Sequence, residues 1–217
     1  MAFNDFRDID TVVIPHVQYF IDHCDYDIVI DFYHQYPMGE LSSAQLNEVI
    51  SRGLAIAEHF DNNPRIILEP INERTNTDLP SQIQTFIDEI RGAGYTYRIC
   101  VNKWEQSWNS FAQIDDPLDE FYTGYHYYFT NGAWSSAESQ MQQALNLGLK
   151  IINTEIGADY NEASQFQSSE VERVNEFMQW CASRDIGNTV WMLYGEQNLP
   201  TYISMGLENP LTGILIH

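Results

Sequence analysis

KIINTEIG (150–157) and RIILEPINE (65–73) are each a short apolar run with a polar tip, with Glu155 near the end of the first and Glu73 at the end of the second. Buried parallel strands have this composition because both of their faces are covered by other parts of the protein. In a (β/α) barrel, catalytic side chains follow the carboxyl ends of such strands. The two stretches therefore predict parallel strands that bring Glu73 and Glu155 to one face of a barrel.

The rest of the chain alternates between helical periodicity and short β-rich runs, which is typical of parallel strands joined by crossover helices. Strands are predicted at residues 26–34, 65–70, 97–102, 122–128, 150–157 and 188–195. Helices are predicted at residues 11–24, from Ser42 or Ser43 to about 59, at 80–91, from Ser135 or Ser136 to about 146, and at 169–184. The predicted fold class is α/β: a TIM-barrel-like (β/α) barrel truncated to about six clear parallel strands, with residues 1–217 as a single domain.

The composition argues against several kinds of partner. The 217 residues include 31 acidic and 10 basic side chains, for a formal net charge of −21, so the clustered Arg and Lys that bind nucleic acid are missing. The same charge disfavours anionic membrane surfaces, and no apolar run approaches the roughly 20 residues that span a bilayer. The three cysteines form no zinc or disulfide pattern. A neutral substrate is therefore expected.

The chemistry that two such glutamates indicate is glycoside hydrolysis, in which a proton donor and a nucleophile or base flank one sugar bond. Glu69 lies inside the same strand as Glu73 and is predicted to be a buried or structural carboxylate instead. A metal site built from His34, His126 and a glutamate lacks a local ligand motif such as HExxH. No metal and no cofactor is therefore expected.

Five segments together resemble family 5 glycoside hydrolases, the cellulase-like (β/α)8 barrels of clan A. They are IVIDFYH (28–34), INE (71–73), GYHYY (124–128), TEIG (154–157) and VWMLYG (190–195), in the order of the family's third, fourth, sixth, seventh and eighth strands. The resemblance covers about residues 10–195. Since each segment alone is short, their order and spacing carry the resemblance.

The resemblance implies a role for each matched side chain. Glu73 would be the general acid/base and Glu155 the nucleophile, and Asn72 would donate a hydrogen bond to a sugar hydroxyl. The remaining residues expected to bind substrate are His34, His126, Tyr128, Trp191 and Trp104. Trp104, Trp108 and Trp134 are either binding subsites or loop packing, and the sequence leaves that choice open.

The implied activity is that of a retaining endo-β-glycosidase, which hydrolyses a neutral β-1,4-linked glucan or mannan by double displacement. A rival interpretation is a non-catalytic carbohydrate-binding or scaffold protein derived from a truncated barrel, and a third is an inverting hydrolase. Secretion is expected from the resemblance, although the first ten residues lack the apolar segment of a signal peptide.

The resemblance begins at the family's third strand, so the first two βα units are expected to be absent. An open six-stranded sheet would leave unpaired edges at residues 28–33 and 189–194, and exposed edges invite association. Three arrangements would account for the absent units and the open edges. The chain is a fragment, or two chains form a homodimer through the open edges, or the first 14 residues and the tail after Gly206 patch the gap.

Overall fold

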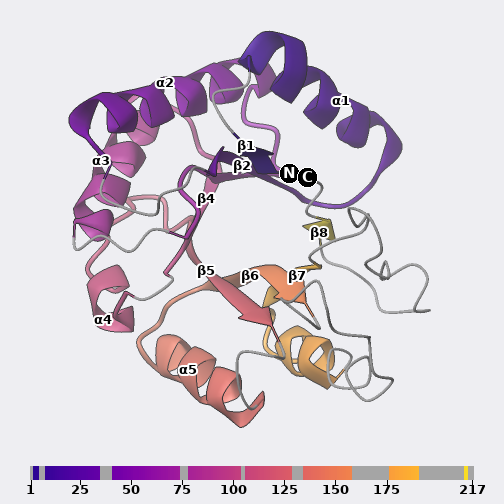
Figure 1. The fold of residues 1–217 in the computed structure, drawn as a ribbon, viewed down its shortest axis with the longest axis vertical. Coiled ribbons are helices and arrows are strands. Elements are labelled where there is room, and N and C mark those ends of the chain that lie inside the picture. The colour runs from indigo at the N-terminus through magenta and orange to yellow at the C-terminus, as the bar shows by residue number, and fades with distance from the viewer. Residues whose placement is uncertain are drawn as a thin grey trace.

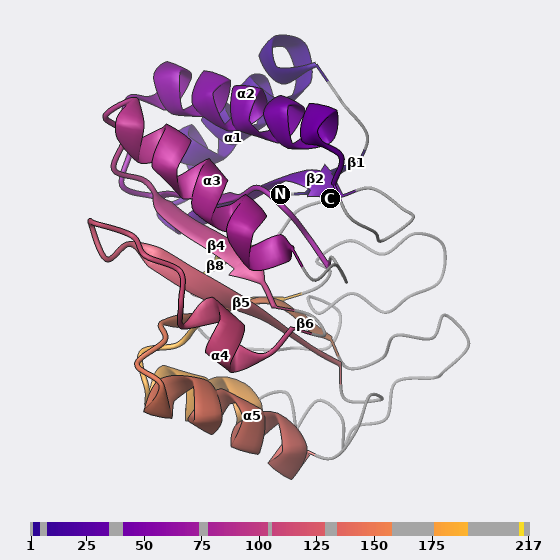
Figure 2. The same ribbon diagram turned by 90° about the vertical axis from the view of Figure 1, so that its left-hand side faces the viewer.

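The computed structural model describes residues 2–4, 8–34, 41–73, 78–103, 106–128, 134–157, 176–190 and 213–214. In this part of the chain, a curled parallel sheet lies at the centre and the helices surround it on the outside (Figures 1 and 2). None of the described helices is both long enough and apolar enough to cross a membrane.

The sheet consists of parallel strands that follow one another in chain order. They are β1 (Ala2–Asn4), β2 (Ile28–His34), β3 (Ile66–Glu69), β4 (Arg98–Asn102), β5 (Phe121–Tyr128), β6 (Ile151–Gly157), β7 (Gly187–Val190) and β8 (Gly213–Ile214). β8 also contacts β2, so the sheet curls back toward its own beginning (Figure 1). The six strands expected from the sequence are confirmed as β2 to β7.

Two short strands occupy the edges that the sequence left open. β1 pairs with β2 through Ala2 and Asp31, and β8 pairs with β7 through Ile214 and Val190. The first 14 residues and the tail after Gly206 thus each add a strand to the sheet, as the patching arrangement expects. The fragment and the homodimer stay predictions.

The helices cover the outside of the sheet and connect successive strands. They are α1 (Ile14–His23), α2 (Ser43–Phe60), α3 (Leu79–Gly92), α4 (Trp108–Phe111) and α5 (Trp134–Asn146), with residues 176–182 also helical. Ser42 begins α2 with a capping box: its hydroxyl accepts from the Gln45 amide, and the Gln45 side chain accepts from the Ser42 amide. The sequence did not predict α4 or the π-helical turn at Ile9–Val13 that precedes α1.

The interior of the curled sheet is built in layers, because every second residue of a strand faces the same side. The lower layer is an apolar cluster of Val29, Ile67, Cys100 and Ile152. The buried polar residues two positions further along the same four strands form the next layer: Asp31, Glu69, Asn102 and Thr154. The polar layer therefore lies toward the carboxyl ends of the strands.

The opposite end, at the amino ends of the strands, is held by basic side chains. Arg65 donates to the carbonyl oxygens of Ile21, Cys24 and Tyr26, which ties the end of α1 to the start of β3. Arg98 pairs with Asp27 at 2.7 Å, joining β4 to the start of β2.

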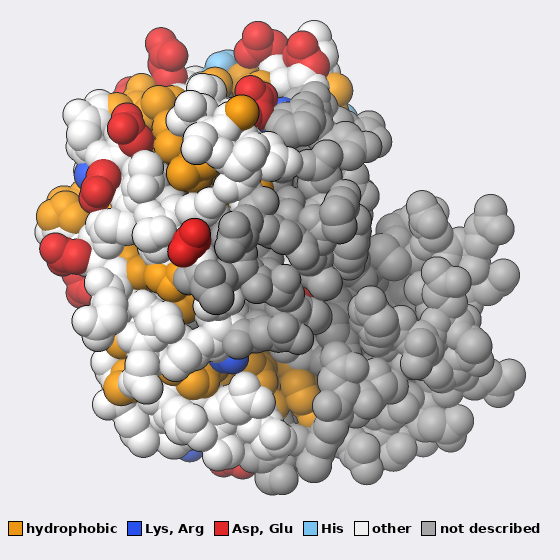
Figure 3. All heavy atoms as spheres, turned by 60° about the vertical axis from the view of Figure 1, so that its left-hand side comes forward, with side chains coloured by type: hydrophobic (Ala, Val, Ile, Leu, Met, Phe, Trp, Pro, Cys, Tyr) orange, Lys and Arg blue, Asp and Glu red, His pale blue; other side chains and the backbone are white. Residues whose placement is uncertain are grey.

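Two further basic residues continue this pattern. Arg91 binds Asp116 through Nε and Nη2, both at 2.8 Å, and their side chains are only 7% and 2% exposed. Lys150 pairs with Asp119 at 2.9 Å, but the Asp119 side chain is 89% exposed. Elsewhere on the face drawn in Figure 3, acidic side chains are scattered widely and basic ones are few, in line with the net charge.

Candidate active site

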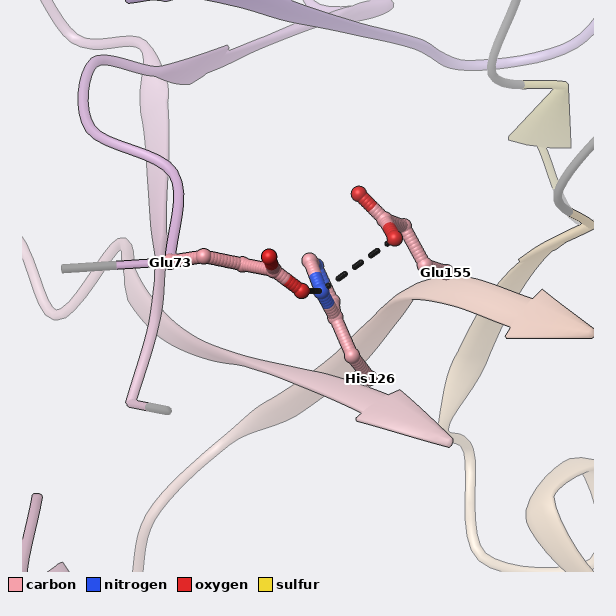
Figure 4. Close-up of side chains that lie close together, drawn as sticks. All are labelled: Glu73, His126 and Glu155. Carbon is pink, nitrogen blue, oxygen red and sulfur yellow. Dashed lines mark hydrogen bonds and ion pairs between the residues drawn. The ribbon is translucent and has the colours of Figure 1, made fainter. Parts of the chain in front are cut away.

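Glu73, His126 and Glu155 meet at the carboxyl ends of β3, β5 and β6 (Figure 4). Nδ1 of His126 lies 2.7 Å from Oε1 of Glu73 and 3.3 Å from Oε2 of Glu155. One oxygen of each glutamate and one ring nitrogen of His126 all lie within 4.8 Å of one another. The two glutamates therefore face a shared space, as their positions in the sequence predict.

A β-bulge explains why two consecutive residues of β6 can reach His126. Tyr125 pairs with Asn153, but the next residue, His126, pairs with Glu155, so Thr154 is the extra residue of β6. In a regular strand, Thr154 and Glu155 would face opposite sides of the sheet. Bulges re-aim side chains and are common beside active sites. Here Nε2 of His126 lies 3.0 Å from Oγ1 of Thr154, while Nδ1 faces Glu155.

The backbone at Glu73 has an uncommon conformation. Its φ angle is +44°, in the left-handed region, which costs a residue with a Cβ atom about 1–3 kcal/mol. Glu73 follows Asn72, which is buried, and its own side chain is 14% exposed. The chain thus turns sharply after β3 and presents the Glu73 carboxyl group to His126.

Beneath these groups lies a buried carboxyl group, Glu69, which is 1% exposed. Its Oε1 lies 3.1 Å from Oγ1 of Thr154. Burial, followed by the negative charge of Asp31, holds the pKa of Glu69 well above its ordinary value, and the hydrogen bond that Thr154 would donate to the ionised carboxylate opposes this only in part. The prediction that Glu69 is buried is confirmed.

The sequence reasoning singled out neither Thr154 nor Asp31. The signal was available in the spacing, since Thr154 is two residues after Ile152 and Asp31 two residues after Val29, and strand alternation puts each pair on one face. The bulge that turns Thr154 and Glu155 toward the same ring left no such signal.

The other expected site residues have different outcomes. Trp108 is buried and packs against Tyr125 with ring centroids 6.0 Å apart, so its role is packing. Nζ of Lys103 lies 4.6 Å from the centre of the same indole. Several expectations fall outside what the structure describes, namely the whole of Trp104 and Trp191 and the side chains of His34, Tyr128 and Trp134.

The cluster has the composition for two kinds of chemistry. Two carboxylate oxygens and an imidazole nitrogen are possible metal ligands, and Glu73, His126 and Glu155 could each supply one. Two glutamates that face one another are also the arrangement that glycoside hydrolysis uses, with a carboxyl separation of about 5–5.5 Å for retention and about 6.5–9.5 Å for inversion.

Comparison with known protein families gives a match over most of the chain. The cellulase family model, glycosyl hydrolase family 5, matches residues 8–197. No curated protein sequence matches the chain significantly.

Three solved structures illustrate the shared fold. A halotolerant family 5 cellulase from an Icelandic hot spring isolate is 21% identical, with a TM-score of 0.72 over 89% of this chain and 64% of its own. The mannanase catalytic domain of Streptomyces sp. SirexAA-E is 16% identical, with a TM-score of 0.57 over 78% and 57%. The Thermomonospora fusca β-mannanase in complex with mannotriose is 16% identical, with a TM-score of 0.61 over 78% and 59%. The chain thus spans less than two thirds of the length of each.

Proposed function

The chain belongs to glycosyl hydrolase family 5, and from this membership and the site geometry we propose that it is a retaining endo-β-glycosidase acting on a neutral β-1,4-linked glucan or mannan. The observation that carries the proposal is the approach of Glu73 and Glu155, whose nearest ligand atoms lie within 4.8 Å of each other and of His126. The similar structures include a cellulase and β-mannanases, which supports these two substrate classes.

The proposed reaction has two displacements. Glu155 attacks the anomeric carbon, while Glu73 donates its proton to the glycosidic oxygen and the leaving sugar departs. Glu73, now ionised, then takes a proton from a water molecule, which attacks the same carbon and releases Glu155. Two inversions leave the anomeric configuration unchanged. Asn72, beside Glu73, would hold a sugar hydroxyl through its amide.

Substitution of the two glutamates tests this assignment. We expect Glu155→Ala to abolish hydrolysis of soluble β-glucan and β-mannan, and Glu73→Gln to lower kcat by about 10²–10⁴-fold, as measured by reducing-sugar release. Glu58→Gln, which changes an exposed carboxylate on α2, is the matched control and should behave as wild type. Circular dichroism checks that each variant is folded.

Further measurements separate the rival functions. Proton NMR of the first product should show the β anomer before mutarotation, and an α anomer would identify an inverting enzyme. A wild-type protein that binds β-glucan or β-mannan in a pull-down assay and releases no sugar would be the non-catalytic carbohydrate-binding protein instead. Full activity of the Glu73→Gln, Glu155→Ala double variant would refute the residue assignment.

A further inference from the structure

A chain of hydrogen bonds runs beneath the two proposed catalytic glutamates and ends in the barrel interior. Oε1 of Glu69 lies 3.1 Å from Oγ1 of Thr154, which lies 3.0 Å from Nε2 of His126. Nδ1 of the same ring faces Glu73 at 2.7 Å and Glu155 at 3.3 Å. The imidazole of His126 therefore connects the buried carboxyl group to both glutamates.

The hydrogen bonds from Glu69 through Thr154 to His126 can be donated in either of two opposite directions, depending on where the protons are. An ionised Glu69 can only accept, so Thr154 would donate to it and accept from an Nε2–H of His126. In a neutral ring Nδ1 would then carry no proton. A protonated Glu69 can donate to Thr154, which then donates to Nε2, and the ring proton is on Nδ1. The protonation of Glu69 thus selects the tautomer of His126.

The surroundings of Glu69 favour the protonated form. Its side chain is buried in the interior among Asp31 on β2, Cys100 on β4 and Thr154 on β6, with Glu73 above it. Burial and the charge of Asp31 both raise its pKa, and the pKa of the buried Cys100 thiol is also raised, so this thiol stays neutral. The hydrogen bond with Thr154 and the positive charge of the N-terminal amino group lower the pKa of Glu69, but burial and the charge of Asp31 have the larger effect.

The tautomer matters for proton donation. If Nδ1 carries the proton, it donates to Oε1 of Glu73 and to Oε2 of Glu155, and the acidic proton of Glu73 occupies Oε2, where it can reach the glycosidic oxygen. If Nδ1 carries no proton, its lone pair accepts the acidic proton from Oε1 of Glu73, 2.7 Å away. That bond would hold the proton away from the leaving group.

We propose that Glu69 and Thr154 are positioning residues: a neutral Glu69 donates to Thr154, and Thr154 holds His126 as the Nδ1–H tautomer, which keeps the Glu73 proton available to the substrate. This proposal rests on the proposed function for its kinetic consequence. The tautomer itself is independent of any activity, so the two can be tested separately.

The tautomer is read by long-range ¹H–¹⁵N NMR of ¹⁵N-histidine-labelled protein without substrate, with the His126→Gln variant to assign the signal. Wild type and Glu69→Gln should both show Nδ1–H, because the glutamine amide also donates to Thr154. Thr154→Val, which lacks the hydroxyl at nearly the same volume, should lose this preference. An Nε2–H or doubly protonated ring in wild type would overturn the proposal, whether or not the protein hydrolyses sugars.

Kinetics with two leaving groups test the consequence. Phenyl β-cellobioside needs an acid to leave, whereas 2,4-dinitrophenyl β-cellobioside leaves without one. We expect Thr154→Val to lower kcat about 10–100-fold on the phenyl substrate and less than about threefold on the dinitrophenyl substrate, with wild-type KM. Thr154→Ser keeps the hydroxyl and should keep both rates within about threefold.

Substitutions at Glu69 complete the test. Glu69→Gln should retain the phenyl rate within about threefold, whereas Glu69→Leu, which has no donor, should fall as Thr154→Val does. If the variants lose kcat equally on both substrates, or if Glu69→Gln loses as much kcat as Glu69→Leu, the residues act only through packing. If Glu69→Leu does not fold, the comparison of Thr154→Val with Thr154→Ser decides between the proposal and a packing role. A wild type that is inactive on both cellobiosides and on the corresponding mannobiosides contradicts the proposed function and leaves the NMR result standing.

Discussion

The two ends of the barrel use charge in opposite ways. At the amino ends of the strands, Arg65, Arg91 and Arg98 bind carbonyl oxygens and carboxylates. At the carboxyl ends, Glu73 and Glu155 converge on one imidazole, above the buried Glu69. One end places opposite charges together and the other gathers acids.

The difference indicates what each end contributes. A buried pair such as Arg91 and Asp116 satisfies both charges and joins α3 to the loop before β5. Gathering several acids around one imidazole costs folding free energy, and in barrels of this kind catalysis takes place at the carboxyl ends of the strands. Changes at the amino end should therefore alter stability alone, and changes at the carboxyl end should alter activity or its pH dependence.

The largest expected effect on stability comes from breaking the pair at the amino end. Arg91→Ala leaves the Asp116 carboxylate 2% exposed without its cation and also removes donors to the carbonyl oxygens of Tyr95 and Tyr97. We expect the free energy of unfolding to fall by about 3 kcal/mol at pH 7, as measured by urea denaturation. Hydrolysis by the folded fraction should be unchanged. A variant that is stable but inactive would contradict the division between the two ends.

The pH dependence of stability should have opposite signs at the two ends. Although burial opposes it, hydrogen bonds from Arg91 and the backbone lower the pKa of Asp116, so its contribution is present above the ordinary pKa and is lost as pH falls through the lowered value. Burial raises the pKa of Glu69, so its contribution to stability is present below its ordinary pKa of 4.5 and is lost as pH rises toward the raised value.

Glu69→Gln isolates the second effect, because glutamine cannot ionise. We expect its free energy of unfolding, relative to wild type, to be constant below about pH 4 and to grow above that by at most about 1.4 kcal/mol per pH unit. Urea titrations at several pH values measure the difference. A gap that is the same at pH 4 and pH 8 would mean that Glu69 ionises as easily in the folded protein as in the unfolded chain.

The smallest effect is expected at the surface of the amino end. Lys150 pairs with Asp119, but this pair is largely open to solvent. Lys150→Ala should therefore lower the free energy of unfolding by less than about 1 kcal/mol, and added salt should reduce the difference further. A decrease in the free energy of unfolding as large as that of Arg91→Ala would show that burial does not determine how much these ion pairs stabilise the fold.

Much of the fold could be predicted from local pattern. The six strands β2 to β7 follow apolar runs, and α2 begins at a serine with glutamine three residues later. β1 and β8 could not be predicted, because they contain three and two residues and depend on the strands they pair with. The four residues of α4 are likewise too short to show a period.

The candidate site was predicted in part, for the same reason. Glu73 and Glu155 end two apolar runs, so their meeting could be expected from strand direction alone. The sequence could not decide between a binding role and a packing role for Trp108, and its contact with Tyr125 indicates packing.

The sequence by itself determined that this is a parallel α/β barrel of family 5 with two glutamates at one end, because apolar runs, caps and motif order are local properties of the chain. Only the tertiary structure decided that Thr154 and Glu155 both reach His126, since that depends on a bulge in the pairing of β5 with β6. It also decided that Glu69 lies beneath them, because burial depends on residues distant in the chain.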